Sequence, residues 1–309
     1  MASTLKIQPS WQGSLSHKAF GNEMSIGRKY PEKSQIGFGD PFALDVIRIA
    51  TSNVSRRLGE VAQVVPLSDY SMSNRQNHTL CVASYSGYVS GTLGLNDNLT
   101  RAIALGHDLG QPAFAHAGES FLSLALERQG RGKFAHEGFG VIVAIEIASL
   151  NLTFEVADGI FGHSGKGNGP KDLSNEARVV RIVDNIANLF EDIESLSRDG
   201  ISDASIRKSV KRFGSNVVCQ IVNTLNAFIQ ESIACEEISF ERSEWATDFH
   251  GLRNMAYDKL YSKVDEKRDY VPKYLGKCIE IVAEHKVFRG CDPIAVVAQL
   301  TDREAKKIA

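Results

Sequence analysis

Residues 107–119 read HDLGQPAFAHAGE, and this stretch begins with an adjacent histidine and aspartate at the end of a predicted helix. The helix is expected over residues 97–108, where apolar side chains recur at helical spacing, and Gly110 is expected to end it. Neighbouring residues on a helix point about 100° apart, so His107 and Asp108 can approach one ion only from a helix end. The following turn gives them this freedom, although the pair alone is more typical of a capping histidine beside a solvated aspartate.

Two further potential metal ligands lie outside this stretch. His78 lies upstream in NRQNH, and Asp184 lies downstream in RVVRIVDN. Together with the central pair they make a set of two imidazoles and two carboxylates. Such a mixed nitrogen and oxygen site suits Mn, Fe, Co or Mg better than structural zinc. An open position on the ion would hold water or a phosphate oxygen, so the set predicts hydrolytic chemistry.

More histidines follow the central pair. His116 and Glu119 are three residues apart, so they share a face if the segment is helical. A carboxylate beside an imidazole orients it and raises its pKa, which favours a proton donor or shuttle near neutral pH. Taken alone, this pair equally fits a surface ion pair, and His136 and His163 are each more typical of structural residues. Five of the eight histidines nevertheless fall between positions 78 and 163, and this clustering favours a shared site.

The segment around Asp184 is otherwise built for burial. Asn188 and Asp192 follow at i+4 and i+8, so three polar side chains share one stripe of a helix rich in Ile, Val, Leu and Ala. Burying such groups is costly unless they bind something. The stripe therefore indicates a functional surface.

Length and composition limit the class of protein. The chain has 309 residues, 43% hydrophobic content and a formal net charge of −2, so a buried core is expected, and nucleic-acid binding is possible but not indicated. Its five cysteines form no CxxC pair, which indicates reduced thiols and a cytoplasmic protein. No membrane-spanning helix is expected, because no sufficiently long apolar run occurs. The N-terminus lacks the apolar segment of a signal peptide.

Most of the chain is predicted to be helical, and period-2 alternation is nearly absent. Ser174 is the expected N-cap of the helix that carries Asp184, with Glu176 in its first turn. The predicted helices span residues 74–93, 97–108, 136–149, 174–198, 204–233, 274–286 and 292–307. Short strands are considered only at residues 61–65 and 236–240, and residues 162–170 are expected to form a loop.

The expected fold class is all-α. The predicted organisation is one helical domain with additions at both ends. Residues 1–37 are expected to form an irregular arm, and residues 38–200 the helical core. Residues 201–309 are expected to form a helical C-terminal extension that packs on this core.

Several motifs occur along the chain in the order found in one known family. The stretch at residues 107–119 is similar to the family signature HDLGHPPFGHAGE, and residues 74–78 stand where the family has Arg-x-x-His. Further similar segments lie at residues 44–64, 134–137, 155–163 and 176–192. The chain thereby resembles the HD-domain superfamily and, more narrowly, the deoxyguanosine triphosphate triphosphohydrolase (dGTPase) family. The resemblance covers about half of the chain, from Asp45 to Gly200.

The resemblance implies an all-α HD fold and hydrolysis of a deoxynucleoside triphosphate to a deoxynucleoside and tripolyphosphate. It implies a divalent metal ion (Mn, Mg, Co or Fe) and a homo-oligomer, because pockets in this family are often completed across subunits. The implied metal ligands are His78, His107, Asp108 and Asp184. The predicted catalytic residues are His116, polarised by Glu119, and His136. The predicted substrate-binding residues are Gln63, Arg75, Gln111, His163, Asn188 and Asp192, with Arg75 on phosphate and Gln63 and Asp192 near the sugar.

The chain also departs from the family pattern. Gln111 replaces a histidine of the signature, and Ala113 replaces its second proline. Asn188 stands where the family usually has tyrosine, at a position expected to pack near the nucleoside. Ala62 lies where a Lys-Thr-Gln segment is usual. These differences bear on which base the protein prefers.

Three functions are therefore compared. The leading hypothesis is a metal-dependent dNTP triphosphohydrolase. The second is an HD phosphohydrolase of another nucleotide phosphate ester, which would release orthophosphate rather than tripolyphosphate. The third is a non-catalytic nucleotide-binding sensor, motivated by Gln111 and Asn188. A pure sensor would have no need of His116 beside Glu119, so the sequence favours an enzyme.

Overall fold

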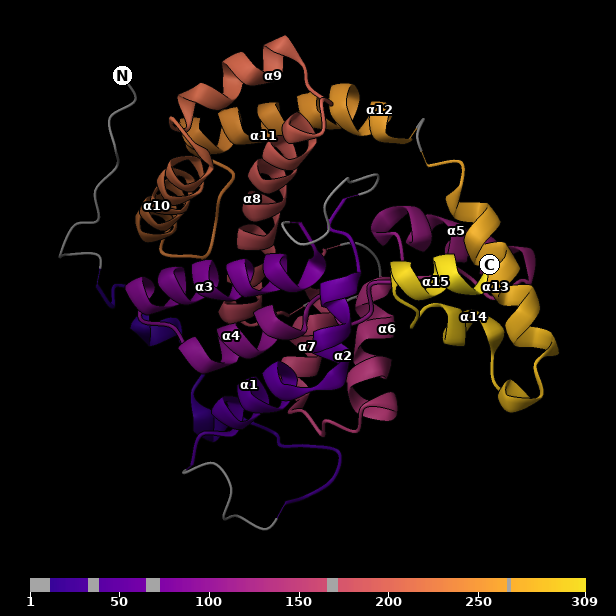
Figure 1. Cartoon of the computed structure of the whole chain (residues 1–309). Helices are drawn as coiled ribbons and strands as arrows, with labels where there is room; N and C mark the ends of the chain where they lie inside the picture. The colour runs from indigo at the N-terminus through magenta and orange to yellow at the C-terminus, as the bar shows by residue number, and fades with distance from the viewer. Residues whose placement is uncertain (1–11, 33–38, 65–72, 166–171, 266–267) are drawn as a thin grey trace.

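The computed structural model describes residues 12–32, 39–64, 73–165, 172–265 and 268–309, and regular structure within these ranges is entirely helical (Figure 1). Two isolated β-bridges join Arg28 to Thr153 and Ala62 to Asn74, and neither extends into a strand. The predicted all-α fold class is therefore confirmed.

The described α-helices follow one another along the chain, with 3₁₀ and π-helical segments between some of them. The first eight are α1 (Pro41–Thr51), α2 (Asn53–Arg57), α3 (Arg75–Leu93), α4 (Asp97–Gly106), α5 (Ala115–Arg128), α6 (His136–Ile142), α7 (Phe154–Gly162) and α8 (Asn175–Arg198). The others are α9 (Ala204–Ser209), α10 (Val217–Cys235), α11 (Glu244–Ala256), α12 (Ser262–Asp265), α13 (Val271–Glu284), α14 (Pro293–Val297) and α15 (Asp302–Ile308). Short 3₁₀ turns are η2 (Ser16–Lys18), η3 (Asn22–Met24), η4 (Leu58–Glu60), η6 (Val210–Arg212) and η8 (Lys286–Phe288), and the π-helical segments are η5 (Val143–Ile147) and η7 (Tyr257–Tyr261).

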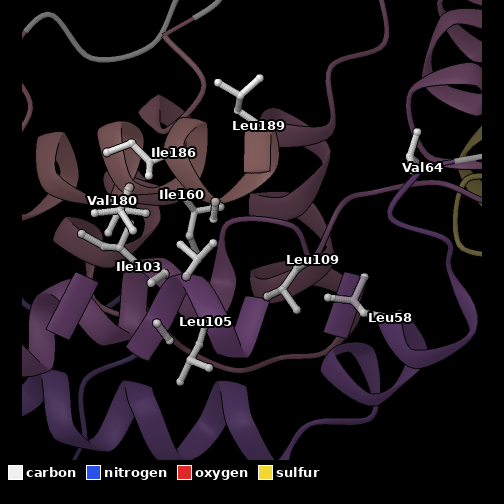
Figure 2. Packing of buried hydrophobic residues seen from close by; sticks show 14 of the residues in the cluster. Leu58, Val64, Ile103, Leu105, Leu109, Ile160, Val180, Ile186 and Leu189 are labelled. Atoms are coloured by element: carbon white, nitrogen blue, oxygen red, sulfur yellow. The ribbon is translucent and has the colours of Figure 1, made fainter. Parts of the chain in front are cut away.

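The core forms where α4 lies between α1 and α3, while α8 packs across α3 and α4 (Figure 1). Helix α7 covers α4 on another side. Ile103 of α4, Ile160 of α7 and Val180 of α8 meet in this core, and all three are fully buried (Figure 2). Burial of each such side chain stabilises the fold by about 1.5–3 kcal/mol. This packing fixes the ends of α3, α4 and α8 relative to one another.

Side-chain caps fix where the central helices begin. Asn74 accepts from the backbone N–H of Asn77 at the start of α3, and Asn96 caps α4 in the same way. Ser174 accepts from the N–H of Ala177 at 3.2 Å and begins α8, which confirms the cap predicted there. Each cap contributes about 1 kcal/mol.

Two predicted helices are interrupted. The helix predicted over residues 204–233 is wrong as one continuous element, because α9 and η6 end before Gly214 and α10 starts afresh after the Asn216 cap. The helix predicted over residues 292–307 is likewise divided into α14 and α15. Thr301 starts the second of these with a capping box, in which its side chain and that of Glu304 each accept from the other's backbone N–H.

The two short strands considered at the sequence level are wrong over their described parts. At residues 61–65 only the single bridge through Ala62 forms, and Val65 lies outside the described residues. At residues 236–240 the chain leaves α10 through Glu236, whose φ of 53° breaks any extended run. Residues 166–170 of the predicted loop at 162–170 also lie outside the described residues.

The C-terminal part of the chain contacts the core in two places (Figure 1). Helix α10 packs on α3 and α8, and α11 packs on α10 and α8. Helices α13 and α14 instead pack on α5, with α15 against α13. The division at residue 200 stays a prediction. Among the described helices, none combines the length and apolarity needed to span a bilayer.

The described part of the N-terminal arm, residues 12–32, packs along the core with little regular structure. Its backbone N–H groups at Gly13 and Leu15 donate to carbonyls at the end of α3, and Leu15 is buried. Farther along, Arg28 forms an ion pair with Asp45 of α1. Residues 12–32 thus contact α1, α3 and α7 from outside, and the bounds of the arm stay a prediction.

Asp45→Ala should destabilise the protein by about 3 kcal/mol, because it removes the fully buried carboxylate that pairs with the guanidinium of Arg28. The Asp45 carboxylate also accepts from the backbone N–H of Thr153 at 3.0 Å and from its hydroxyl at 2.7 Å. Urea unfolding monitored by circular dichroism measures the loss. Lys29→Ala is the matched control, since Lys29 pairs with Glu146 on the surface and should change stability by less than about 0.5 kcal/mol. A loss below 1 kcal/mol for Asp45→Ala would contradict the role of this ion pair in anchoring the arm.

Candidate metal centre and active site

Three helices bring the first group of potential ligands together. His78 lies in the first turn of α3, His107 directly follows α4, and Asp184 lies near the middle of α8. The Nε2 atom of His78 lies 3.0 Å from Oδ1 of Asp184, and Nε2 of His107 lies 3.5 Å from the same oxygen. One ligand atom from each residue lies within 4.8 Å of the others, so this group could hold a metal ion.

The tautomer of His107 favours a ligand role. Its Nδ1 lies 2.7 Å from the carbonyl oxygen of Ala104, which can only accept, so Nδ1 carries a hydrogen. Nε2 then presents a lone pair when the ring is neutral. This atom is buried and has no hydrogen-bond partner. A buried nitrogen without a partner is costly, and a metal ion would satisfy it.

A carboxylate that the sequence analysis missed supports His78. Glu191 of α8 places Oε2 2.9 Å from Nδ1 of His78, on the opposite side of the ring from Asp184. Burial lowers the pKa of His78, but the two carboxylates outweigh it and raise this pKa to about 10. The signal for Glu191 was its i+7 spacing from Asp184, which places both on one face of α8.

Asp108 lies between two groups of histidines. Its Oδ2 accepts from Arg75 at 2.9 Å and lies 3.4 Å from Nε2 of His107, while its Oδ1 lies 3.8 Å from Nε2 of His136. Burial raises the pKa of Asp108, and the charges of Arg75 and the nearby histidines more than reverse this, so its pKa is well below the usual range. One oxygen of Asp108 therefore lies near His107 of the first group, and Asp108 also forms a possible ligand group with His136 and His163.

Glu119 contacts both predicted catalytic histidines. Its Oε2 lies 3.2 Å from Nδ1 of His116, and its Oε1 lies 2.7 Å from Nδ1 of His136. Oε1 also accepts from the backbone N–H of His136 at 3.0 Å. His116 is half exposed toward the pocket, whereas His136 is buried. Glu119 therefore orients both rings, and only His116 has an open side.

The expected rise in the pKa of His116 is wrong for the protein without substrate. Removal of water around the ring lowers this pKa, the hydrogen bond to Glu119 raises it, and the positive charge of Arg75 lowers it again, with a net decrease. His136 shows the opposite result, because Glu119 and Asp108 outweigh burial and raise its pKa. Negative charge on a bound polyphosphate would raise the pKa of His116 again.

A pocket of about 370 Å³ opens beside both groups. Five of the six predicted substrate-binding residues line it, namely Arg75, Gln111, His163, Asn188 and Asp192. The sixth, Gln63, is buried outside this lining and donates to Oδ1 of Asn188 at 2.5 Å. Asn188 in turn donates to Oδ1 of Asp184 at 2.7 Å, so it restrains this carboxylate as well as lining the pocket. Gln111 is fully buried, and neither of its amide atoms has a partner.

Residues that no sequence pattern indicated form the far wall of the pocket. Arg253 and Tyr257 come from the end of α11 and the start of η7, and Tyr261 and Arg268 follow. The hydroxyl of Tyr261 donates to Oδ2 of Asp192 at 2.5 Å. Burial raises the pKa of Asp192 to about 6, although Tyr261 and nearby cations lower it. Only the packing of these segments over α8 brings this wall to the site.

Comparisons with known proteins show which family the chain is similar to. Residues 75–189 match the HD domain family. A deoxyguanosinetriphosphate triphosphohydrolase-like protein of Clostridium perfringens strain 13 is 42% identical over 281 residues, which cover 86% of this chain and 80% of that protein. The chain belongs to the HD-domain family of deoxyguanosinetriphosphate triphosphohydrolase-like proteins.

Other family members match over different lengths. The corresponding protein of Caldanaerobacter subterraneus subsp. tengcongensis is 33% identical over 82% of this chain and 75% of its own length. That of Desulfatibacillum aliphaticivorans is 39% identical over 60% of this chain and 55% of its own length. The HD domain and these dGTPase-like relatives support a metal-dependent phosphohydrolase.

Glu191→Gln should weaken metal binding by at least about 10-fold, since a carboxylate that orients a ligating histidine is worth about 10–100-fold in affinity. The amide keeps the size of the side chain and removes the charge beside His78. Equilibrium dialysis of the metal-free protein against Mn²⁺ measures the change. Glu194→Gln is the matched control, because Glu194 lies on the same helix and is half exposed. Equal affinities for the two variants would refute the supporting role of Glu191.

Proposed function

We propose that this phosphohydrolase cleaves a deoxynucleoside triphosphate at the α-phosphate to give a deoxynucleoside and tripolyphosphate. One observation carries the proposal. The group of His78, His107 and Asp184 adjoins a polar pocket, and the half-exposed ring of His116 lines the same pocket. The family relation supports the same reaction class. The pocket supplies three contacts that such a substrate needs, for the phosphates, for the departing oxygen and for the sugar.

The residues present fit a divalent ion. His78, His107 and Asp184 would hold it, with Asp108 beside them, and the orphaned Nε2 of His107 is the atom that most requires it. Mixed nitrogen and oxygen donors suit Mn, Mg, Co or Fe. When bound, such an ion withdraws charge from the attacked phosphate and lowers the pKa of water toward roughly 7.

Cationic side chains match the charge of a triphosphate. Arg253 and Arg268 line the pocket on the wall formed by the C-terminal segments, and Arg75 lines it near Asp108. Arg75 also donates to Asp108 and to the backbone carbonyl of Gln63, so it is fixed before substrate binds. A preorganised guanidinium stabilises developing phosphate charge without having to be reoriented.

His116 is the proton-transfer residue in this proposal. Its Nδ1 is held by Glu119, which leaves Nε2 for the 5′-oxygen of the departing nucleoside. The approach of negative phosphate charge favours the protonated ring, so substrate binding itself prepares the donor.

Asp192 is assigned to the sugar. Its Oδ2 accepts from Tyr261, while its Oδ1 is buried and has no partner. A sugar 3′-hydroxyl is a donor of the right kind for this oxygen, and a base could then lie near the aromatic wall of Tyr257 and Tyr261. The side-chain amide of Gln111 has no hydrogen-bond partner, and it would similarly form hydrogen bonds with the substrate or with water.

The proposal is tested by incubating the protein with each of the four dNTPs and with GTP under Mn²⁺, Mg²⁺, Co²⁺ or Fe²⁺ and resolving products by chromatography. Tripolyphosphate with a deoxynucleoside is the expected result. Orthophosphate as the only phosphate product would point to another phosphate ester as substrate. Binding of dNTP without turnover under every metal would indicate a sensor.

Assembly and location belong to the same proposal. We expect a homo-oligomer in which a second subunit helps to complete the pocket, as the resemblance to the dGTPase family implies. The five cysteines are all free thiols, which suits the reducing cytoplasm. Light scattering coupled to gel filtration measures the oligomeric state.

A further inference from the structure

Two successive residues just before His116 adopt the left-handed backbone region, which residues other than glycine rarely enter. Phe114 has φ 63° and ψ 24°, and Ala115 has φ 51°. The Cβ atom then approaches a neighbouring carbonyl oxygen, which disfavours this conformation at each residue. The dGTPase family signature has glycine at the position of Ala115, and glycine adopts it without that clash. This chain therefore needs other contacts to hold the Phe114–Ala115 turn.

The Phe114–Ala115 turn sets the direction of His116. Helix α5 begins at Ala115, and the carbonyl oxygen of Phe114 accepts from the backbone N–H groups of Ala117 at 3.2 Å and Gly118 at 3.3 Å. The turn is thus the first hydrogen-bonded turn of the helix that carries His116. A change in its dihedral angles would turn the start of α5 and displace the His116 ring from the pocket.

An aspartate from the C-terminal end of the chain holds this turn. Oδ1 of Asp302 accepts from the backbone N–H of Phe114 at 2.7 Å, although the two residues are 188 positions apart in the sequence. Oδ2 accepts from the N–H of Ala62 at 3.4 Å. Asp302 is the first residue of α15 and is 1% exposed. A hydrogen bond to a carboxylate is stronger than one between neutral groups, so this contact fixes the Phe114 backbone.

Other contacts join the C-terminal segments to the same turn. Arg57 donates to the carbonyl oxygen of Leu300 at 3.1 Å and to that of Gln111 at 2.6 Å, so it connects the residues before α15 to those before Phe114. The fully buried ring of Phe114 packs edge-on against Tyr270, with 5.8 Å between centroids. The turn is therefore held at both its backbone and its side chain.

We propose that Asp302 is a positioning residue for the reaction. By accepting from the N–H of Phe114 it holds the left-handed turn, and the turn directs His116 toward the departing oxygen of the substrate. Glu119 orients the ring of His116, whereas Asp302 places the backbone that carries it. The inference rests on the proton-transfer role of His116 in the proposed function.

A purely structural role for Asp302 predicts a different result. A negative side chain in the first turn of a helix stabilises that helix, and Thr301 already caps α15 with a capping box. If Asp302 only stabilised α15, its loss would lower stability and would not respond to a change in the turn. A glycine at position 115 separates the two roles, because it relieves the turn and leaves α15 as it is.

The test compares variants of the full chain by steady-state kinetics. Asp302→Ala should lower kcat by about 10–100-fold, with KM and metal content near native, because a small displacement of a reacting group is costly. Adding Ala115→Gly to it should recover at least about 5-fold, the usual cost of the left-handed conformation. Ala115→Gly alone should keep the native kcat. Thr301→Ala is the control for α15, since it removes the cap and leaves the acceptor of Phe114, and it should lower stability at native kcat.

A second readout does not involve turnover. Hydrogen exchange of the Phe114 amide, measured by nuclear magnetic resonance, should be faster in Asp302→Ala and near native in Thr301→Ala. A native kcat or native Phe114 exchange in Asp302→Ala would overturn the proposal, and so would a loss of kcat that Ala115→Gly does not recover.

Two further outcomes are distinguishable. If Asp302→Ala fails to fold by circular dichroism, Asp302→Asn decides, because it keeps one oxygen and removes the charge. Its Phe114 amide should exchange faster than in the native protein, and unchanged exchange would overturn the proposal. A native protein that releases no tripolyphosphate would refute the proposed function, and the exchange of Phe114 would still show whether Asp302 holds the turn.

Discussion

Asp184→Ala is expected to remove both the bound metal ion and turnover, because Asp184 is the carboxylate that both His78 and His107 face. Loss of a direct ligand should weaken metal binding by more than about 100-fold, since even an outer partner is worth about 10–100-fold. The same change also removes the acceptor of the Asn188 amide. Metal content after dialysis and the rate of tripolyphosphate release measure the two effects.

Two variants make this result specific. Asp184→Asn keeps an oxygen for Asn188 and removes the charge, so it should retain the fold and still lose most of the metal affinity. Glu194→Ala lies on the same helix, where the side chain is half exposed, and should leave both quantities unchanged. Full activity of Asp184→Ala with native metal content would refute the ligand assignment.

His116→Ala should separate chemistry from binding. We expect kcat to fall by about 10²–10⁴-fold, the usual worth of a positioned general acid or base. Metal content and substrate affinity should change little, because His116 is half exposed and contacts Glu119 rather than the first ligand group. Steady-state kinetics and metal analysis on the same preparation give the comparison.

The control is His285→Ala, which changes an exposed histidine far along the chain and should keep the native kcat. An unchanged kcat in His116→Ala would exclude its proton-transfer role. A fall in kcat that accompanies loss of metal would instead make His116 part of the metal centre, which would also contradict the assignment.

Much of the site was predictable because its residues sit in local patterns. The apolar spacing of α4 and the turn after it placed His107 and Asp108 at a helix end, where both can face inward. The polar stripe from Asp184 to Asp192 followed from helical spacing alone. The Ser174 cap was readable for the same reason, since a capping bond spans only three residues.

Other features depend on which segments pack together. Tyr261 reaches Asp192 only because η7 lies over α8, and nothing in the spacing of the two segments relates them. The interruption of the predicted helix at residues 204–233 has a local signal in Gly214 and Asn216, and it was missed because apolar periodicity continues on both sides.

The sequence by itself determined the all-α class, the candidate ligands and the pairing of His116 with Glu119, because each follows from local patterns of residues along the chain. Only the tertiary structure decided that Asp108 faces His136 and His163, that Glu191 supports His78, and that the far wall carries Arg253 and Tyr261. These contacts join residues from different helices, and their distances follow from how the buried apolar faces of those helices pack.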